Sequence, residues 1–221
     1  MIDFGPIHAR ALERWGEAAL QDRLPVVKDP AALGAVPDDR YLSLLCLRVF
    51  RAGLKHSLVD QKWPAFEEVF HGFAPGRVAA MTEEDLEPLM AEPRLIRHWG
   101  KLKSVPVNAA ALSAISAESH GFGQWLSSFS TERILDLWDA LAKRFTQLGG
   151  DSGPRFLRMA GKDTFILSPS VEAALKVWGV SEGGKGTAER ARIAAQFTAW
   201  AAETGRPLAH LSMILACSVP D

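Results

Sequence analysis

The segment 55–66 brings polar, acidic and aromatic side chains together directly after an apolar stretch of the sequence. Lys55 and His56 interrupt that stretch, and His56 adds a group that titrates near neutral pH. Asp60 adds a carboxylate, and Trp63 adds a broad ring face. These side chains can stack on a planar ligand and place a charge beside it. Trp63 fits a place in a hydrophobic core equally well, so both interpretations stay open.

A glycine-rich turn lies within residues 147–158, between two stretches of helical periodicity. Such a turn can point successive backbone N–H groups outward at a helix start, where the helix dipole also attracts a phosphate. A plain helix connection ending in a glycine cap, with arginines on a solvated face, is the alternative. In the first interpretation the residues that contact a phosphate backbone are Gly150, Ser152, Gly153, Arg155 and Arg158.

Helices must position these groups, because apolar residues recur at helical spacing almost everywhere and the alternation typical of strands is absent. Helix starts are expected at Thr82, at Ser130 and at 168–170, where Ser170 serves as an N-cap. The sequence therefore predicts an all-α protein of about ten helices. One of them is expected near 7–20, followed by an irregular connection.

Composition limits the alternatives. A chain of 221 residues with a net charge of −1 exerts no global attraction on nucleic acid, so any DNA binding depends on a local basic face. Cys46 and Cys217 are expected to be reduced thiols of a cytoplasmic protein. Neither a membrane span nor a signal peptide is indicated. We expect a single domain, 1–221, whose two closely packed lobes are 1–40 plus 165–221, and 41–164.

Three phrases of the sequence together carry a family resemblance: 52–54 (Ala-Gly-Leu), 78–85 (Val-Ala-Ala-Met-Thr-Glu-Glu-Asp) and 96–101 (Ile-Arg-His-Trp-Gly-Lys). From Tyr41 to Ala114 the chain resembles the 3-methyladenine DNA glycosylase I family. The resemblance implies a helix-hairpin-helix fold and excision of an alkylated base that has been flipped out of the DNA. It also implies that Lys101, at the start of the helix before the hairpin, contacts DNA. The implied partner is double-stranded DNA with an alkylated base, bound by a monomer.

The resemblance breaks at positions that matter for substrate recognition. Arg48 stands where the family has a glutamate that contacts the base, and an arginine has no hydrogen-bond acceptor. His56 stands where the family has a tryptophan that stacks on the base. We therefore expect an altered base pocket formed by Arg48, Lys55, His56 and Trp63. The family's zinc ligands are also missing, since only His210 and Cys217 remain in the tail, so no metal or other cofactor is expected.

Departure of a base leaves a sugar with positive charge, which a nearby carboxylate stabilises. Asp60 or Glu67 could replace the base-contacting carboxylate that is lost at Arg48, and Asp60 is also a candidate for the catalytic one. In the wider superfamily an aspartate opens the helix after the hairpin; here Ser170 is at that helix start, and Asp163 is the nearest acid. Arg155 rather than a lysine follows Pro154, so a lysine nucleophile is not supported. The catalytic candidates are Asp163 and Asp60.

Three functions compete. The favoured hypothesis is a monofunctional DNA glycosylase of base excision repair that hydrolyses the N-glycosidic bond of an alkylated purine such as 3-methyladenine. The alternative is a non-catalytic protein that binds damaged DNA on the same scaffold, consistent with Arg48 and Ser170 at positions where relatives have carboxylates. A helical protein whose pocket takes an unrelated small molecule is the third, because a fold does not dictate a function.

Overall fold

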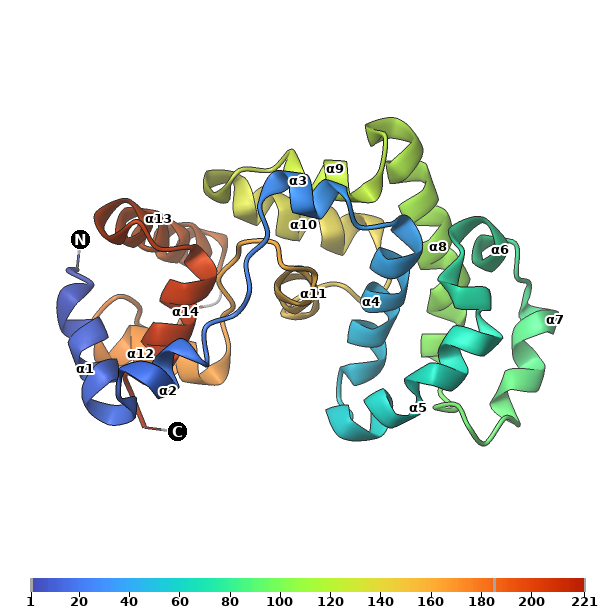
Figure 1. Ribbon diagram of the computed structural model, residues 1–221, viewed down its shortest axis with the longest axis horizontal. Helices are drawn as coiled ribbons and strands as arrows, with labels where there is room; N and C mark the ends of the chain where they lie inside the picture. Colours follow the sequence, from blue (N-terminus) through green and yellow to red (C-terminus); the bar gives the residue numbers. More distant parts are fainter. Residues whose placement is uncertain (1, 185, 221) are drawn as a thin grey trace. The chain divides into compact units, whose positions relative to one another are not determined.

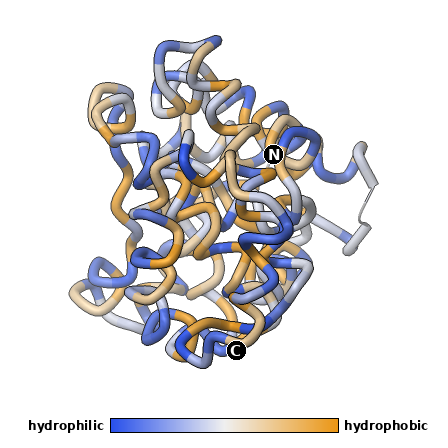
Figure 2. Tube along the Cα trace, turned by 90° about the vertical axis from the view of Figure 1, so that its right-hand side faces the viewer, coloured by the Kyte–Doolittle hydropathy of each residue, from blue (hydrophilic) through white to orange (hydrophobic). Residues whose placement is uncertain are grey.

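The computed structural model describes residues 2–184 and 186–220, which fold into helices and connecting turns without any strand (Figure 1). The all-α prediction is therefore confirmed. Hydrophilic and hydrophobic residues alternate along the helices, as expected when each helix buries one face (Figure 2). Within the same residues, no helix has both the length and the apolar character needed to cross a membrane.

The chain forms two compact units, each built from segments that are distant in sequence. Unit 1 comprises Met1–Lys28, Phe129–Asp136 and Gly161–Asp221, and unit 2 comprises Asp29–Ser128 and Leu137–Ala160. The expected lobes had assigned 29–40 to the terminal lobe. The structure assigns them to unit 2 because the helix Pro30–Gly34 packs on Phe122–Ser127.

Unit 1 is built around one apolar helix, α14, against which α1, α12 and α13 pack. The helix expected near 7–20 is divided at Gly16, whose φ of 73° ends one helix and begins the next. Phe197 stacks on Phe165 with ring centroids 4.4 Å apart, and its edge meets Trp200 at 5.2 Å. The helices of unit 1 are α1 (Gly5–Trp15), α2 (Glu17–Gln21), η3 (Thr131–Arg133), α12 (Pro169–Val177), α13 (Thr187–Thr204) and α14 (Leu208–Cys217).

Unit 2 is organised around α4 and α8, because α4 packs on α5, α8 and α11, while α6 packs on α8. Helix α10 (Ile134–Arg144) starts in unit 1 and continues into unit 2. The remaining helices of unit 2 are α3 (Pro30–Gly34), α4 (Asp38–Arg51), α5 (His56–Val69), η1 (His71–Phe73), α6 (Pro75–Ala79), α7 (Glu83–Leu86), η2 (Glu87–Met90), α8 (Trp99–Ser119), α9 (Phe122–Ser127) and α11 (Ser152–Ala160).

Helix starts follow the side-chain signals closely, with one correction. Thr82 forms a capping box with Asp85 at the start of α7, as expected. Ser130 precedes η3 but makes no side-chain cap bond. The N-cap of α12 is Ser168, which accepts from the Val171 N–H at 3.3 Å, so the assignment of that role to Ser170 was wrong. Ser170 is already inside the helix, because Pro169 takes the first helical position.

Candidate functional site

The glycine-rich turn between α10 and α11 is a compact hairpin in unit 2. Gln147 and Gly150 take positive φ angles of 66° and 56°, and the Ser152 N–H donates to Gly149 O at 3.2 Å. Helix α11 begins at Ser152, and because Pro154 has no N–H and the Ser152 N–H is bonded to Gly149 O, its first turn has the Gly153 N–H without an acceptor in the helix. Gly153 is buried, and a Cβ there would lie 3.0 Å from Leu148 O. The hairpin therefore presents the Gly153 N–H and the positive end of the α11 dipole, the two backbone features that favour an anion at a helix start.

Helix α8 holds this hairpin in place through a buried amide. Asn108 is fully buried, donates to Thr146 O at 3.1 Å and accepts from the Thr146 N–H at 2.8 Å. The Gln147 amide adds a bond to Gly100 O at 2.9 Å. Both backbone groups of Thr146, its N–H and its C=O, are therefore held by Asn108 at the point where the turn begins.

Arg48 extends from α4 to the first residue of α11. Its Nη2 lies 3.4 Å from Ser152 Oγ, and the residue is 8% exposed. Within residues 2–184 and 186–220, the buried Nε has no hydrogen-bond partner. Burial lowers the pKa of the guanidinium, and the nearby charges of Arg155 and Arg51 lower it further, while Asp151 raises it. Arg48 is therefore a buried cation in a positive neighbourhood.

Lys101 is buried beside the same helix, but its ammonium already has partners. Nζ donates to Phe50 O at 3.2 Å and to Ala52 O at 2.5 Å, at the carboxyl end of α4, where the helix dipole favours a cation. Burial lowers its pKa, and the charge of Arg48 adds to that shift. Lys101 is 6% exposed and its ammonium binds the carboxyl end of α4. This placement does not fit its predicted role as a DNA contact.

Both arginines of α11 lie beyond the hairpin and are half-buried. Arg155 has a weak ion pair with Asp151, with nitrogen and oxygen 3.7 Å apart. Arg158 lies three residues further along the same helix. The structure thus brings together Arg48, the predicted hairpin residues and Arg155 within unit 2.

Lys55 and His56 lie exposed at the start of α5, where Lys55 is the N-cap position. A turn at Gly53, with φ of 74°, leads into this start. Asp60 is exposed on the next turn of α5 and binds Arg51, with oxygen 2.6 Å from Nη2. These polar groups are accessible to a ligand, and the Asp60 carboxylate is shared with an arginine.

Trp63 lies in the core of unit 2 and is 9% exposed. Its ring stacks between Phe66 and Phe73, with centroids 4.8 and 5.4 Å away. This burial matches the core interpretation of Trp63. With two phenylalanine rings stacked on it and 9% exposure, the Trp63 ring has little accessible surface for a flipped base.

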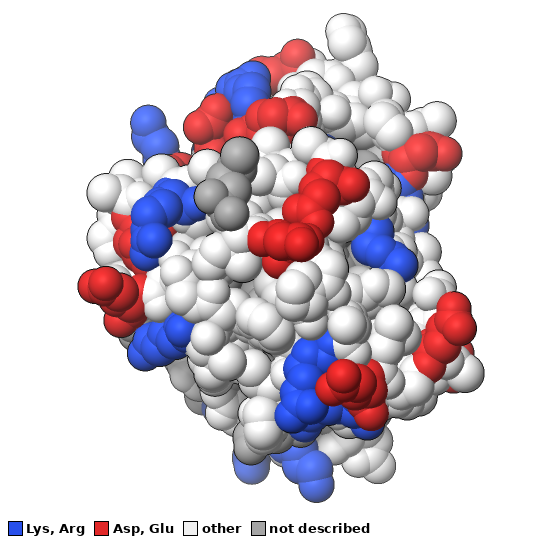
Figure 3. Space-filling model, turned by 90° about the vertical axis from the view of Figure 1, so that its left-hand side faces the viewer, with Lys and Arg blue, Asp and Glu red and all other residues white. Residues whose placement is uncertain are grey.

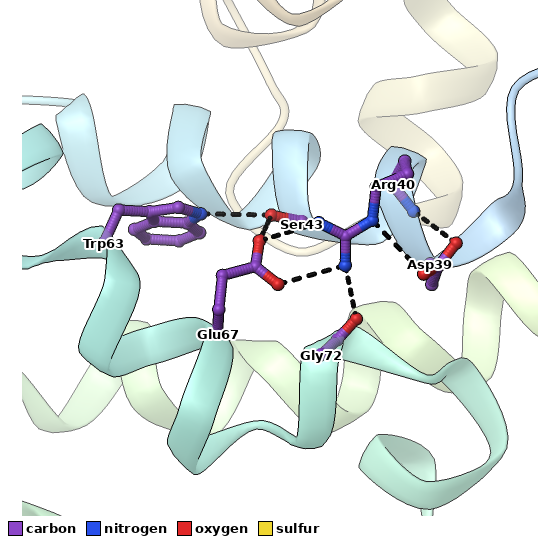
Figure 4. A network of polar contacts seen from close by, with 6 residues as sticks. All are labelled: Asp39, Arg40, Ser43, Trp63, Glu67 and Gly72. Atoms are coloured by element: carbon purple, nitrogen blue, oxygen red, sulfur yellow. Dashed lines mark hydrogen bonds and ion pairs between the residues drawn. The ribbon is translucent and has the colours of Figure 1, made fainter.

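The indole N–H of Trp63 opens a polar network that sequence reasoning missed (Figure 4). It donates to Ser43 Oγ at 3.0 Å, and the Ser43 hydroxyl donates to Glu67. The Arg40 guanidinium donates to both carboxylate oxygens of Glu67, at 3.1 and 3.0 Å, and to Gly72 O at 2.6 Å. Glu67, once a candidate carboxylate, is therefore a structural group. Arg40 and Ser43 are three residues apart on α4 and therefore share one helix face, a spacing that could have indicated a common partner.

Asp163 belongs to unit 1, where it accepts from the Leu208 and Ala209 N–H groups at 3.1 and 2.8 Å. It therefore caps the start of α14, a structural use of a carboxylate that the sequence indicates as a catalytic candidate. The remaining catalytic candidate, Asp60, belongs to unit 2.

The residues of the tail do not fit a zinc site. His210 Nε2 lies 3.0 Å from Pro25 O, and the Cys217 side chain is buried. Across the described part of the chain, no three His, Cys, Asp or Glu side chains are grouped as metal ligands would be. We therefore derive no chemistry from a metal.

Charges of both signs are interspersed on the surface, as the face in Figure 3 shows. Several arginines are neutralised locally, such as Arg94, which binds Glu68 at 2.9 Å and Glu92 at 3.1 Å. The positive region around Arg48 is therefore a local feature of unit 2.

Comparisons with known proteins agree with this arrangement. A family model described as methyladenine glycosylase matches residues 34–147, just over half of the chain. DNA-3-methyladenine glycosylase 1 of Escherichia coli is 32% identical over 120 residues, which is 53% of this chain and 64% of that protein. The chain thus matches slightly less than two thirds of that relative's length.

Two solved structures show the same fold. 3-methyladenine DNA glycosylase I of Staphylococcus aureus is 25% identical, with a TM-score of 0.50 over 68% of this chain and 91% of that one. The 8-oxoguanine glycosylase/lyase of Methanocaldococcus jannaschii is only 12% identical but covers 95% of this chain and 93% of its own, with a TM-score of 0.55. At that identity the second likeness concerns the fold alone, and it extends over both units.

Proposed function

Because the chain belongs to the methyladenine glycosylase family, we propose that it is a monofunctional DNA glycosylase of base excision repair. It would hydrolyse the N-glycosidic bond of an alkylated purine such as 3-methyladenine after flipping the base out of double-stranded DNA. We also propose that the protein acts in the cytoplasm as a monomer. The observation that carries it is the hairpin before α11, held by Asn108 and facing a cation.

Chemically, the reaction asks little of the enzyme when the leaving base is already cationic. A methylated purine of that kind departs as a neutral molecule, and a carboxylate near the sugar stabilises the charge that develops there. Asp60 is the accessible candidate, since Asp163 is bound to two N–H groups of α14. We assign base contact to His56 and Lys55, which are exposed at the start of α5.

The test is base release from methylated duplex DNA, with 3-methyladenine and the methylguanines separated by chromatography. We expect release above that of heat-treated protein, and a loss of about 100-fold for Asp60→Asn if its carboxylate stabilises the transition state. Arg94→Gln, which changes an exposed arginine paired with two glutamates, is the matched control. Absence of release for every methylated purine would overturn the proposal.

A non-catalytic protein that binds damaged DNA is the second candidate. It is favoured by the structural partners of both candidate acids, Arg51 for Asp60 and the start of α14 for Asp163. Binding to duplexes with an abasic-site analogue separates the two candidates. Tight binding without base release supports this second function, whereas absence of binding at low salt contradicts both.

A further inference from the structure

Arg48 is a buried arginine with two positive neighbours, Arg155 and Arg51, and within residues 2–184 and 186–220 it has no carboxylate ion pair of its own. Its side chain is 8% exposed, its Nε is unpartnered, and its nearest polar contact is a neutral hydroxyl at 3.4 Å. A buried charge without a counterion is strongly unfavourable, because burial removes the hydration of the ion. An anion bound next to Arg48 would remove that penalty.

The direction of the side chain indicates where that anion would bind. Nη2 points to Ser152 Oγ, in the first residue of the nine-residue helix α11. The Ser152 N–H already donates to Gly149 O and Pro154 has no N–H, so the first turn offers the Gly153 N–H together with the positive end of the helix dipole. Arg155 adds positive charge nearby. Asp151 is the opposing acid, but it is exposed and interacts with Arg155 at 3.7 Å. Two independent donors of positive potential, a helix N-terminus and a buried guanidinium, thus meet at one point.

We infer that Arg48 is a phosphate-binding residue, which together with the N-terminus of α11 holds one phosphate group. This assignment rests on the proposed function for its natural ligand, a phosphate of the DNA backbone, but the same chemistry would also bind free inorganic phosphate. A guanidinium presents planar pairs of donors that match two phosphate oxygens, which a neutral residue or a carboxylate cannot do. Arg48 would accordingly contribute affinity for DNA rather than selection of the base.

The first measurement is the salt dependence of binding to a duplex with an abasic-site analogue, for wild type, Arg48→Met and Arg94→Gln. Each phosphate contact adds about 0.9 to the slope of log K against log salt. We expect Arg48→Met to lower that slope by about one contact and to weaken binding by about 10- to 100-fold, the loss typical of one charged hydrogen bond. Arg94→Gln should match wild type, because Glu68 and Glu92 already neutralise Arg94. An unchanged slope for Arg48→Met would overturn the inference.

The second measurement uses inorganic phosphate alone and does not depend on DNA. A ligand that binds only the folded state raises the unfolding midpoint, so phosphate should stabilise wild type more than chloride at equal ionic strength. Arg48→Met should lose this shift, whereas Arg48→Lys, which keeps a charge but not the paired donors, should retain part of it. If Arg48→Met does not fold, Arg48→Lys gives the same comparison.

The two proposals can fail separately. A phosphate shift that depends on Arg48, in a protein that neither binds DNA nor releases a base, would support the phosphate site and contradict the glycosylase. Base release combined with equal phosphate stabilisation of wild type and Arg48→Met would support the glycosylase and contradict the phosphate site. A changed preference among methylated bases with an unchanged salt slope would mean that Arg48 reads a base edge, which also contradicts our inference.

Discussion

Arg48 and Lys101 show how partners decide what a buried cation does. Both residues are less than 10% exposed, and burial lowers the pKa of both. The Lys101 ammonium is held by two carbonyls at the end of α4, so its charge is used within the fold. Among the described residues, the Arg48 guanidinium has one hydrogen-bond partner, Ser152 Oγ at 3.4 Å. Lys101 thus uses two of its three N–H donors in the fold, whereas the Arg48 Nε has no partner among the described residues.

Trp63 tests whether an aromatic residue in this segment serves the core or a ligand. We expect Trp63→Ala to lower the free energy of unfolding by about 3–5 kcal/mol, because it leaves a cavity between Phe66 and Phe73. Trp63→Phe should lose less, since it keeps the stack but removes the donor to Ser43. Urea denaturation measures both. Unchanged stability with loss of base release would instead assign Trp63 to base stacking.

Tyr41 gives a pH prediction that can be read without interference, because it is the only tyrosine. Burial raises the pKa of its phenol to about 12, with a contribution from Asp38, and its hydroxyl donates to Leu33 O at 2.7 Å. The folded state therefore favours the protonated form. This stabilisation is complete below pH about 10, the ordinary pKa, and is lost as pH rises towards 12.

The ultraviolet spectrum of tyrosinate measures this titration. Folded protein should ionise Tyr41 well above the pH at which protein unfolded in urea does so. Ionisation at the same pH in both states would show that the phenol is not buried as the structure has it.

At the scale of elements, local signals in the sequence predicted the helices well. Thr82 with Asp85 specifies the start of α7 within four residues, so neighbouring side chains suffice to define it. Gly16 divides the first helix at a positive φ, and the glycine itself is the sequence signal against one continuous helix over 7–20. Ser168 rather than Ser170 caps α12 because Pro169 must occupy the first turn.

The candidate site was less predictable, because its contacts join elements far apart in sequence. The hairpin could be located from its glycines, but the approach of Arg48 to Ser152 depends on how α4 packs against α11. The burial of Lys101 and Trp63 likewise results from packing around α4. Asn108 left a signal of its own, because an amide within the mostly apolar sequence 105–115 needs a buried hydrogen-bond partner.

The two hydrogen bonds from Asn108 of α8 to the Thr146 backbone, which we call the clamp, lead to a prediction about Asn108. We expect Asn108→Ala to lower the free energy of unfolding by about 1–3 kcal/mol, because both backbone groups of Thr146 lose their buried partner. Amide hydrogen exchange at 146–151 should also become faster. Gln147→Ala, which removes one exposed bond to Gly100, is the matched control and should have a smaller effect. Equal exchange in both variants would contradict the clamp.

At the scale of the whole molecule, the residues expected to bind phosphate and base lie in one unit. Arg48, His56, Asp60 and the hairpin belong to unit 2, and Asp163 belongs to unit 1. Unit 1 draws on three separate segments of the chain, so no single continuous piece contains it alone. Unit 2, in contrast, is contained within 29–160, together with Phe129–Asp136 of unit 1.

This difference predicts how truncated chains behave. A fragment of residues 29–160 keeps every segment of unit 2, including the buried Leu141 and Phe156, and should unfold cooperatively on heating. A fragment of residues 1–128 has nearly the same length but lacks both α10 and α11, so α4 loses α11 as a packing partner. It should show little helical signal and no sharp transition in circular dichroism. If both fragments melt alike, the two units do not have separate cores, because a chain without Leu137–Ala160 would then suffice to fold.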